Sequence, residues 1–166
     1  KVGHSLRFLQ ALHDSGVAAA DLYTAFARAR ASDSIAVDSL YLARDTHWQT
    51  RGPRIVAQTV AAFVKSQPWF AGLDKAEFVI DSIVIDRVGD VGVMTTLPQF
   101  PLRSLKLSFG AEKTKCYQVY QLQRADSAKV PSRSLFHDDF QRSRILIIGD
   151  SFSRIYQTDE PRGAGW

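Results

Sequence analysis

One short stretch, residues 145–154, constrains the fold of this chain more than any other. Ile145 to Ile148 are all apolar, and three of the four are β-branched, a pattern typical of a buried β-strand. A Gly149-Asp-Ser151 turn follows at once and leads into a predicted helix. Open α/β folds place their active sites beyond the carboxyl ends of their strands. Ser151 is therefore a candidate nucleophile at the edge of a sheet.

The composition is that of an ordinary globular domain. The chain has 166 residues, of which 45% are hydrophobic and 23% charged, enough for one domain with its own core. No apolar run approaches the roughly 18 residues that span a membrane. Cys116 is the only cysteine, so no internal disulfide or thiolate zinc cluster can form, and we expect it in the core. The net charge of +4 favours an anionic partner, but no nucleic-acid-binding motif is present.

The periodicity of apolar residues predicts helices and strands of an α/β protein. We expect Gly16 to end the first helix, and Thr50 and Asp90 to cap the third and fourth. Asp21 is expected to cap the second helix, with a catalytic role as the alternative. Helices are predicted over 4–15, 23–31, 51–66 and 91–97, strands over 17–22, 40–42, 78–88, 105–109, 116–122 and 145–148, and a polar loop over 125–139.

A serine hydroxyl needs a base before it can attack a carbonyl. His47 is the best candidate of the four histidines, because it lies at a predicted strand-to-helix junction, two residues after Asp45. In an extended segment these two side chains point the same way, so Asp45 can orient the imidazole while its other nitrogen takes the serine proton. The alternative is a capping aspartate beside a packed histidine, and the spacing alone does not decide between them.

Several motifs together resemble one known family. Asp45-Thr-His-Trp48, Gly52 with its helix, Gly89-Asp90 and Gly149-Asp-Ser-Phe-Ser153 are similar to the SGNH-hydrolase-like domain of the periplasmic alginate O-acetyltransferases, the AlgJ/AlgX family. The resemblance runs from about Val17 to the end of the chain. Common SGNH esterases carry Gly-Asp-Ser first and Asp-x-x-His last, whereas the alginate acetylation proteins have Asp-x-His first, as here.

The resemblance implies a fold and three catalytic roles. The expected fold is an α/β, SGNH-hydrolase-like, three-layer arrangement, with a central, mostly parallel sheet flanked by helices and truncated at the C-terminus. The expected unit is one domain over residues 1–166 that is a fragment of a longer chain. Ser151 would be the nucleophile, His47 the general base and Asp45 its orienting carboxylate, while Asp150 would serve the turn and the helix start.

The resemblance also implies an acyltransferase, a polysaccharide O-acetyltransferase of the periplasm. A membrane-bound O-acyltransferase would deliver an acetyl group, which would pass through Ser151 onto hydroxyls of an anionic exopolysaccharide such as alginate. No cofactor, metal or nucleic acid is expected. Arg44 and Arg154 could bind substrate carboxylates, and Trp48 could stack on a sugar ring. Surface arginines and a packed tryptophan are the alternatives.

Two other functions fit the same residues. A carbohydrate acetylesterase of this fold would use water in place of the sugar hydroxyl. A non-catalytic polysaccharide-binding module of an export and acetylation complex would have the same fold, but its function would depend on the basic surface.

Overall fold

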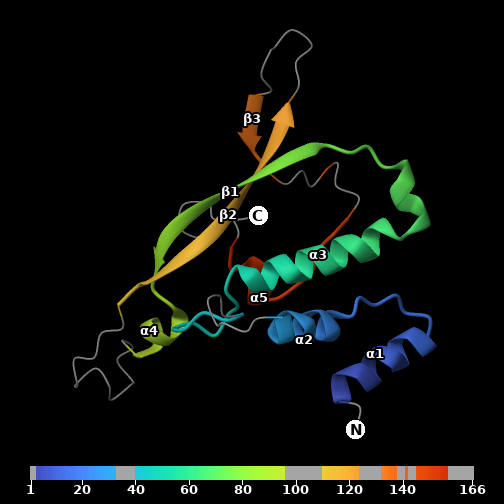
Figure 1. The fold of residues 1–166 in the computed structure, drawn as a ribbon, viewed down its shortest axis with the longest axis horizontal. Helices are drawn as coiled ribbons and strands as arrows, with labels where there is room; N and C mark the ends of the chain where they lie inside the picture. Colours follow the sequence, from blue (N-terminus) through green and yellow to red (C-terminus); the bar gives the residue numbers. More distant parts are fainter. Residues whose placement is uncertain are drawn as a thin grey trace. The chain divides into compact units, whose positions relative to one another are not determined.

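The computed structural model describes residues 3–32, 40–95, 110–123, 132–137, 141 and 145–156, traced in colour in Figure 1. The chain divides into two compact units, residues 1–39 with 51–73, and residues 40–50 with 74–166. The predicted single domain over residues 1–166 stays a prediction. None of the described helices is long and apolar enough to cross a membrane.

The first unit is helical. The first helix ends at Asp14, and Gly16 follows its C-cap residue Ser15 with a φ of 76°, in the left-handed region that favours glycine. The predicted stop of the helix at Gly16 is thus confirmed to within two residues. Asp21 accepts a 2.8 Å hydrogen bond from the Thr24 backbone N–H, so the capping interpretation of Asp21 is confirmed. The elements of this unit are α1 (His4–Asp14), α2 (Leu22–Ser32), α3 (Arg51–Lys65) and the short 3-10 helix η1 (Pro68–Gly72).

Two predictions fail near these helices. Residues 17–21 are irregular rather than a strand, because they only connect α1 to α2 and no described segment pairs with them. Thr50 directly precedes α3, but no hydrogen bond from the first turn of α3 to its hydroxyl is found among the described residues. Its hydroxyl instead donates a 2.7 Å hydrogen bond to the carbonyl oxygen of Lys115.

The second unit is built on an antiparallel sheet. Figure 1 shows β1 and β2 as a long twisted pair, with β3 beside one end of β2. Both pairings are antiparallel, so the mostly parallel sheet we expected is not found among the described residues. The elements are β1 (Glu77–Arg87), α4 (Asp90–Thr95), β2 (Glu112–Gln123), β3 (Ser132–Leu135) and α5 (Ser151–Arg154).

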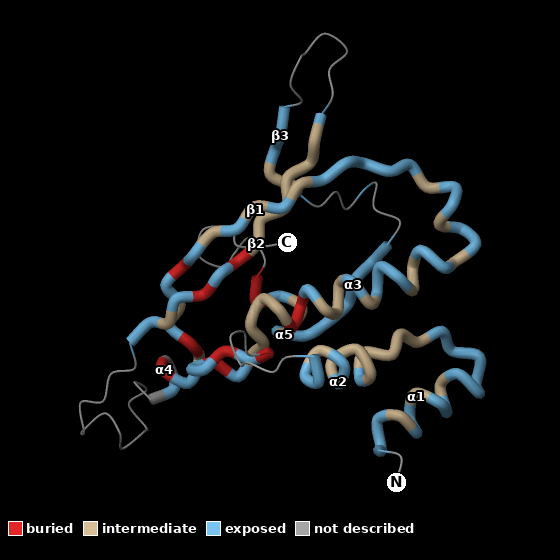
Figure 2. Tube along the Cα trace, viewed as in Figure 1, coloured by how far each residue is buried: buried red, intermediate tan, exposed pale blue. Residues whose placement is uncertain are grey.

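A small core holds this unit together. The two strands face each other with Ile83 opposite Cys116 and Ile85 opposite Thr114, all on one side of the sheet. Cys116 is fully buried, as expected. Figure 2 marks the buried stretches in red on the tube. The buried cluster joins both strands to the segments before His47 and after Ser151, and consists of Leu42, Ile85, Cys116, Ile155 and Tyr156.

The predicted strands are confirmed only in part. β1 and β2 match the strands expected over 78–88 and 116–122, whereas the strand expected over 105–109 lies outside the described residues. Residues 40–42 form a single bridge, Tyr41 to Trp48, instead of a strand. β3 lies within the predicted polar loop, because pairing with the edge of β2 supplies its backbone hydrogen bonds without any apolar pattern.

The stretch from Ile145 to Ile148 does not form the predicted buried strand. It is irregular, and the exposed fraction rises from 45% at Ile145 to 88% at Ile148. An apolar, β-branched run becomes a buried strand only when a neighbouring strand binds its backbone and another layer covers its side chains. The pairings found among the described strands are those of β1 with β2 and of β2 with β3.

Candidate active site

The Asp45-Thr-His47 segment lies in a tight loop closed by two backbone hydrogen bonds. Leu42 donates to the carbonyl of His47 at 3.1 Å, and Gln49 donates to the carbonyl of Leu40 at 3.0 Å. Residues 43–47 between them form a series of bends. The loop presents Asp45 inward, where the residue is only 7% exposed.

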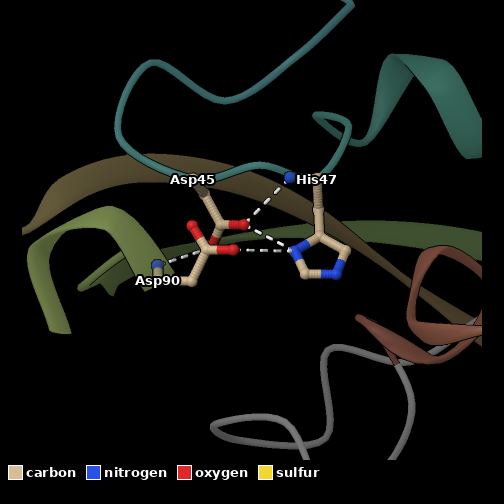
Figure 3. A group of neighbouring side chains, drawn as sticks. All are labelled: Asp45, His47 and Asp90. Atoms are coloured by element: carbon tan, nitrogen blue, oxygen red, sulfur yellow. Dashed lines mark hydrogen bonds and ion pairs between the residues drawn. The ribbon is translucent and has the colours of Figure 1, made fainter. Parts of the chain in front are cut away.

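Asp45 and His47 are paired. The carboxylate atom Oδ1 of Asp45 lies 2.6 Å from Nδ1 of His47 and also accepts the His47 backbone N–H at 3.0 Å (Figure 3). A carboxylate only accepts, so Nδ1 carries a proton in this bond, and in the neutral imidazole Nε2 is then the acceptor. Residues 43–47 are bent rather than extended as we expected. The two side chains meet because Oδ1 of Asp45 accepts two hydrogen bonds from His47.

Arg87 binds the other oxygen of Asp45. Its Nε lies 3.2 Å from Oδ2, and both side chains are well buried. Burial raises the pKa of the Asp45 carboxyl, but the hydrogen bonds from His47 and the charge of Arg87 outweigh it, so the pKa lies below its usual value of 3.8. Asp45 therefore stays ionised and can stabilise an imidazolium.

Asp90 adds a second carboxylate to the cluster. Its Oδ2 is 3.7 Å from Nδ1 of His47, and its backbone N–H donates to Oδ2 of Asp45 at 3.3 Å (Figure 3). Asp90 was predicted to precede a helix over 91–97 as its cap, but it is the first residue of α4. Its carboxylate accepts hydrogen bonds from the backbone N–H and the hydroxyl of Thr46.

These three side chains could in principle hold a cation, because one ligand atom of each lies within 4.8 Å of the others. Hydrogen-bond donors already occupy the oxygens of Asp45, including the positive guanidinium of Arg87. Nδ1 of His47 is itself used as a donor to Asp45. The donor set therefore fits an oriented histidine better than a metal centre.

Ser151 begins α5, directly after the Gly-Asp turn. Asp150 accepts a 3.0 Å hydrogen bond from the backbone N–H of Phe152, so it caps the helix as expected. A Cβ at Gly149 would overlap the side chain of Ser153, so the turn requires glycine. Ser151 is exposed, and the described residues include no hydrogen bond between it and His47.

The serine segment nevertheless packs against the histidine loop. The ring of Phe152, the neighbour of Ser151, lies 5.0 Å from the imidazole of His47 between centroids. The indole N–H of Trp48 donates a 2.7 Å hydrogen bond to the carbonyl of Phe152. Tyr156 completes the link, because its hydroxyl donates to the carbonyl of Trp48 at 3.1 Å. Residues about a hundred positions apart are thus held in one place.

Comparison with known proteins identifies the family of this chain. The family described as SGNH hydrolase-like domain, acetyltransferase AlgX, matches residues 1–159. The chain belongs to the AlgX family. No curated protein matches it significantly.

The chain is similar in fold to a solved structure of AlgX from Pseudomonas aeruginosa. It aligns with a TM-score of 0.54 and 17% sequence identity, over 70% of this chain and 26% of that one. This AlgX-family chain therefore spans about a quarter of that protein's length. The predicted class, an α/β SGNH-hydrolase-like fold, is confirmed.

The predicted substrate-binding residues lie around the loop. Arg44 is exposed, its guanidinium donates to the carbonyl of Gly110, and its backbone N–H donates to the carboxylate of Glu112. Arg154 is exposed in the last turn of α5. Trp48 is partly buried against the small core and is bonded to Phe152, a placement that favours packing. The substrate roles of these three residues stay predictions.

Arg87, Glu112 and Tyr156 were not identified from the sequence. One signal was available for Arg87, which follows Val79, Ile83 and Ile85 at even spacing and so belongs to the buried face of β1. A buried arginine requires an acidic partner. Glu112 and Tyr156 carry no such local signal.

Proposed function

We propose that this AlgX-family chain is the acyl-transfer domain of an exopolysaccharide O-acetyltransferase. The observation that carries the proposal is the 2.6 Å Asp45–His47 pair with the Ser151 segment packed against its imidazole. An ionised Asp45 orients His47, and the Gly-Asp turn presents Ser151 at a helix start. Membership of an acetyltransferase family supports acyl transfer over other serine chemistry.

The proposed reaction has two steps. In the first, Ser151 Oγ attacks the acetyl carbonyl of the donor, Nε2 of His47 takes the hydroxyl proton, and the leaving group departs with that proton. In the second, a sugar hydroxyl gives its proton to Nε2 of His47 and attacks the acetyl-serine. The serine oxygen then leaves with that proton from His47, which releases the acetylated sugar and restores Ser151. The backbone N–H of Ser151 is one proposed donor to the oxyanion.

The proposed acceptor is an anionic polysaccharide such as a polyuronate, in the periplasm. The positive net charge supports this, and Arg44 and Arg154 are the proposed contacts for substrate carboxylates. A membrane-bound O-acyltransferase is the proposed source of the acetyl group.

Turnover of a small acetyl ester by the full-length protein, with and without oligouronate, tests the proposal. We expect Ser151→Ala and His47→Ala each to lower kcat by on the order of 10²–10⁴-fold. Ser153→Ala, which removes the second serine of the same motif, is the matched control and should retain activity. Mass spectrometry should detect acetylated oligouronate.

Other outcomes identify the alternatives. Hydrolysis that ignores the sugar, with no acetylated product, would indicate an acetylesterase. Polysaccharide acetylation that persists unchanged in the Ser151→Ala protein would indicate a non-catalytic module.

A further inference from the structure

A second segment, Arg87 to Asp90, contacts the loop that carries Asp45 and His47. The contacts are made by Arg87, Gly89 and Asp90. Arg87 binds Oδ2 of Asp45 at 3.2 Å. Gly89 is buried, and a Cβ there would overlap the carbonyl of Arg44. The backbone of the two segments is therefore in direct contact where β1 ends and α4 begins.

Asp90 closes a ring of hydrogen bonds with this loop. Its Oδ1 accepts the backbone N–H of Thr46 at 2.8 Å, and its Oδ2 accepts the Thr46 hydroxyl. Its own N–H donates to Oδ2 of Asp45 at 3.3 Å (Figure 3). Asp90 thus binds both Asp45 and the residue that joins Asp45 to His47.

The ring has a mechanical consequence for His47. Thr46 is exposed and lies in a run of bends, so no helix or strand fixes its backbone. Asp90 provides the contacts to the Thr46 N–H and hydroxyl that hold this peptide in place. A shift of about 1 Å in a reacting group can cost on the order of 10²-fold in rate, so such contacts matter for a general base.

We propose that Asp90 is a positioning residue, which fixes Thr46 and thereby sets the imidazole of His47 toward Ser151 without exchanging a proton itself. The inference rests on the proposed function. It assigns Asp90 a role through hydrogen-bond geometry, in contrast to the two roles its charge would suggest, as a metal ligand or as a second orienting acid. These roles differ in what an amide at position 90 would do.

Asp90→Asn and Asp90→Ala in the full-length protein separate them. An asparagine keeps an oxygen for the Thr46 N–H and an amide that can donate to the Thr46 hydroxyl. We expect kcat for the acetyl ester to fall by on the order of 10–10²-fold in Asp90→Ala, with KM unchanged. Asp90→Asn should retain most of kcat. Thr46→Val should lower kcat in the wild type but add little in the Asp90→Ala protein, because both changes break the same contact.

Asp86→Asn is the matched control. Asp86 lies on the face of β1 opposite to Arg87, where its side chain is two thirds exposed and paired with Lys113. Its substitution should leave kcat unchanged. The stoichiometry of fluorophosphonate labelling at completion counts folded active sites, so kcat is expressed per labelled site. If Asp90→Ala lowers the fraction of protein that becomes labelled but leaves kcat per labelled site normal, Asp90 has a purely structural role and the inference is overturned.

Three further results also overturn it. If Asp90→Asn loses as much kcat as Asp90→Ala, the charge of Asp90 acts directly. If Asp90→Ala is fully active while Ser151→Ala and His47→Ala are not, the proposed function stands and only the positioning role falls. Activity unaffected by Ser151→Ala overturns both.

Discussion

The indole nitrogen of Trp48 and the carbonyl oxygen of Phe152 lie 2.7 Å apart, although 104 positions separate the two residues in the chain. Their rings also meet edge to face, with centroids 5.3 Å apart. His47 and Ser151 are the immediate neighbours of these two residues. The contact therefore joins the segment that carries the proposed base to the segment that carries the proposed nucleophile.

Trp48→Phe tests this connection. Phenylalanine keeps most of the packing but has no donor for the Phe152 carbonyl, so we expect the free energy of unfolding to fall by about 1–2 kcal/mol. Urea unfolding followed by circular dichroism measures the change. Trp69→Phe is the control, because Trp69 is half exposed in η1 and its replacement should change stability by less than about 0.5 kcal/mol. Equal effects at the two positions would contradict the prediction.

Gly89→Ala should disrupt the loop around Asp45. The new methyl group would overlap the carbonyl of Arg44 and lie 3.0 Å from Cβ of Asp45. We expect a loss of about 1–3 kcal/mol in the free energy of unfolding, together with reduced ester turnover. Gly72→Ala is matched to it, because a methyl group there has nothing within 4 Å and should be neutral or slightly stabilising. A stable, fully active Gly89→Ala protein would refute the close contact.

The stability that Asp45 provides should depend on pH. Its folded pKa lies below the usual 3.8, so the folded chain holds fewer protons than the unfolded chain in this range. The contribution is therefore complete above about pH 5 and is lost as the pH falls through the lowered pKa. The difference in unfolding free energy between wild type and Asp45→Asn should shrink under acid, as measured by urea unfolding across the acid range. A difference that is constant with pH would contradict the direction of the shift.

Tyr156 should weaken the fold at alkaline pH. Burial raises the pKa of its phenol above the usual 10.0, so the unfolded chain loses this proton first and stability falls as the pH rises past that value. Tyr156→Phe should abolish that part of the alkaline loss, at a cost of about 1 kcal/mol near neutral pH for the lost bond to Trp48. Tyr23→Phe, at a half-exposed position, should leave the alkaline profile of the wild type unchanged.

Local patterns in the sequence determined the helices and the two long strands. The α1 stop at Gly16, the Asp21 cap of α2 and the alternation along β1 depend on residues within a few positions of each other. The family also followed from the sequence, since the order of the two short motifs was sufficient to suggest it.

Tertiary structure alone decided the rest. The Ile145–Ile148 segment is as apolar as a buried strand, but whether it is buried depends on what other segments place around it, and here it is exposed. Asp45 and His47 are paired because one oxygen accepts two hydrogen bonds across a bent loop, not because the segment is extended. Arg87 and Asp90 reach that loop from more than forty positions away. A contact between distant segments depends on the packing of the whole unit, which no local pattern of residues encodes.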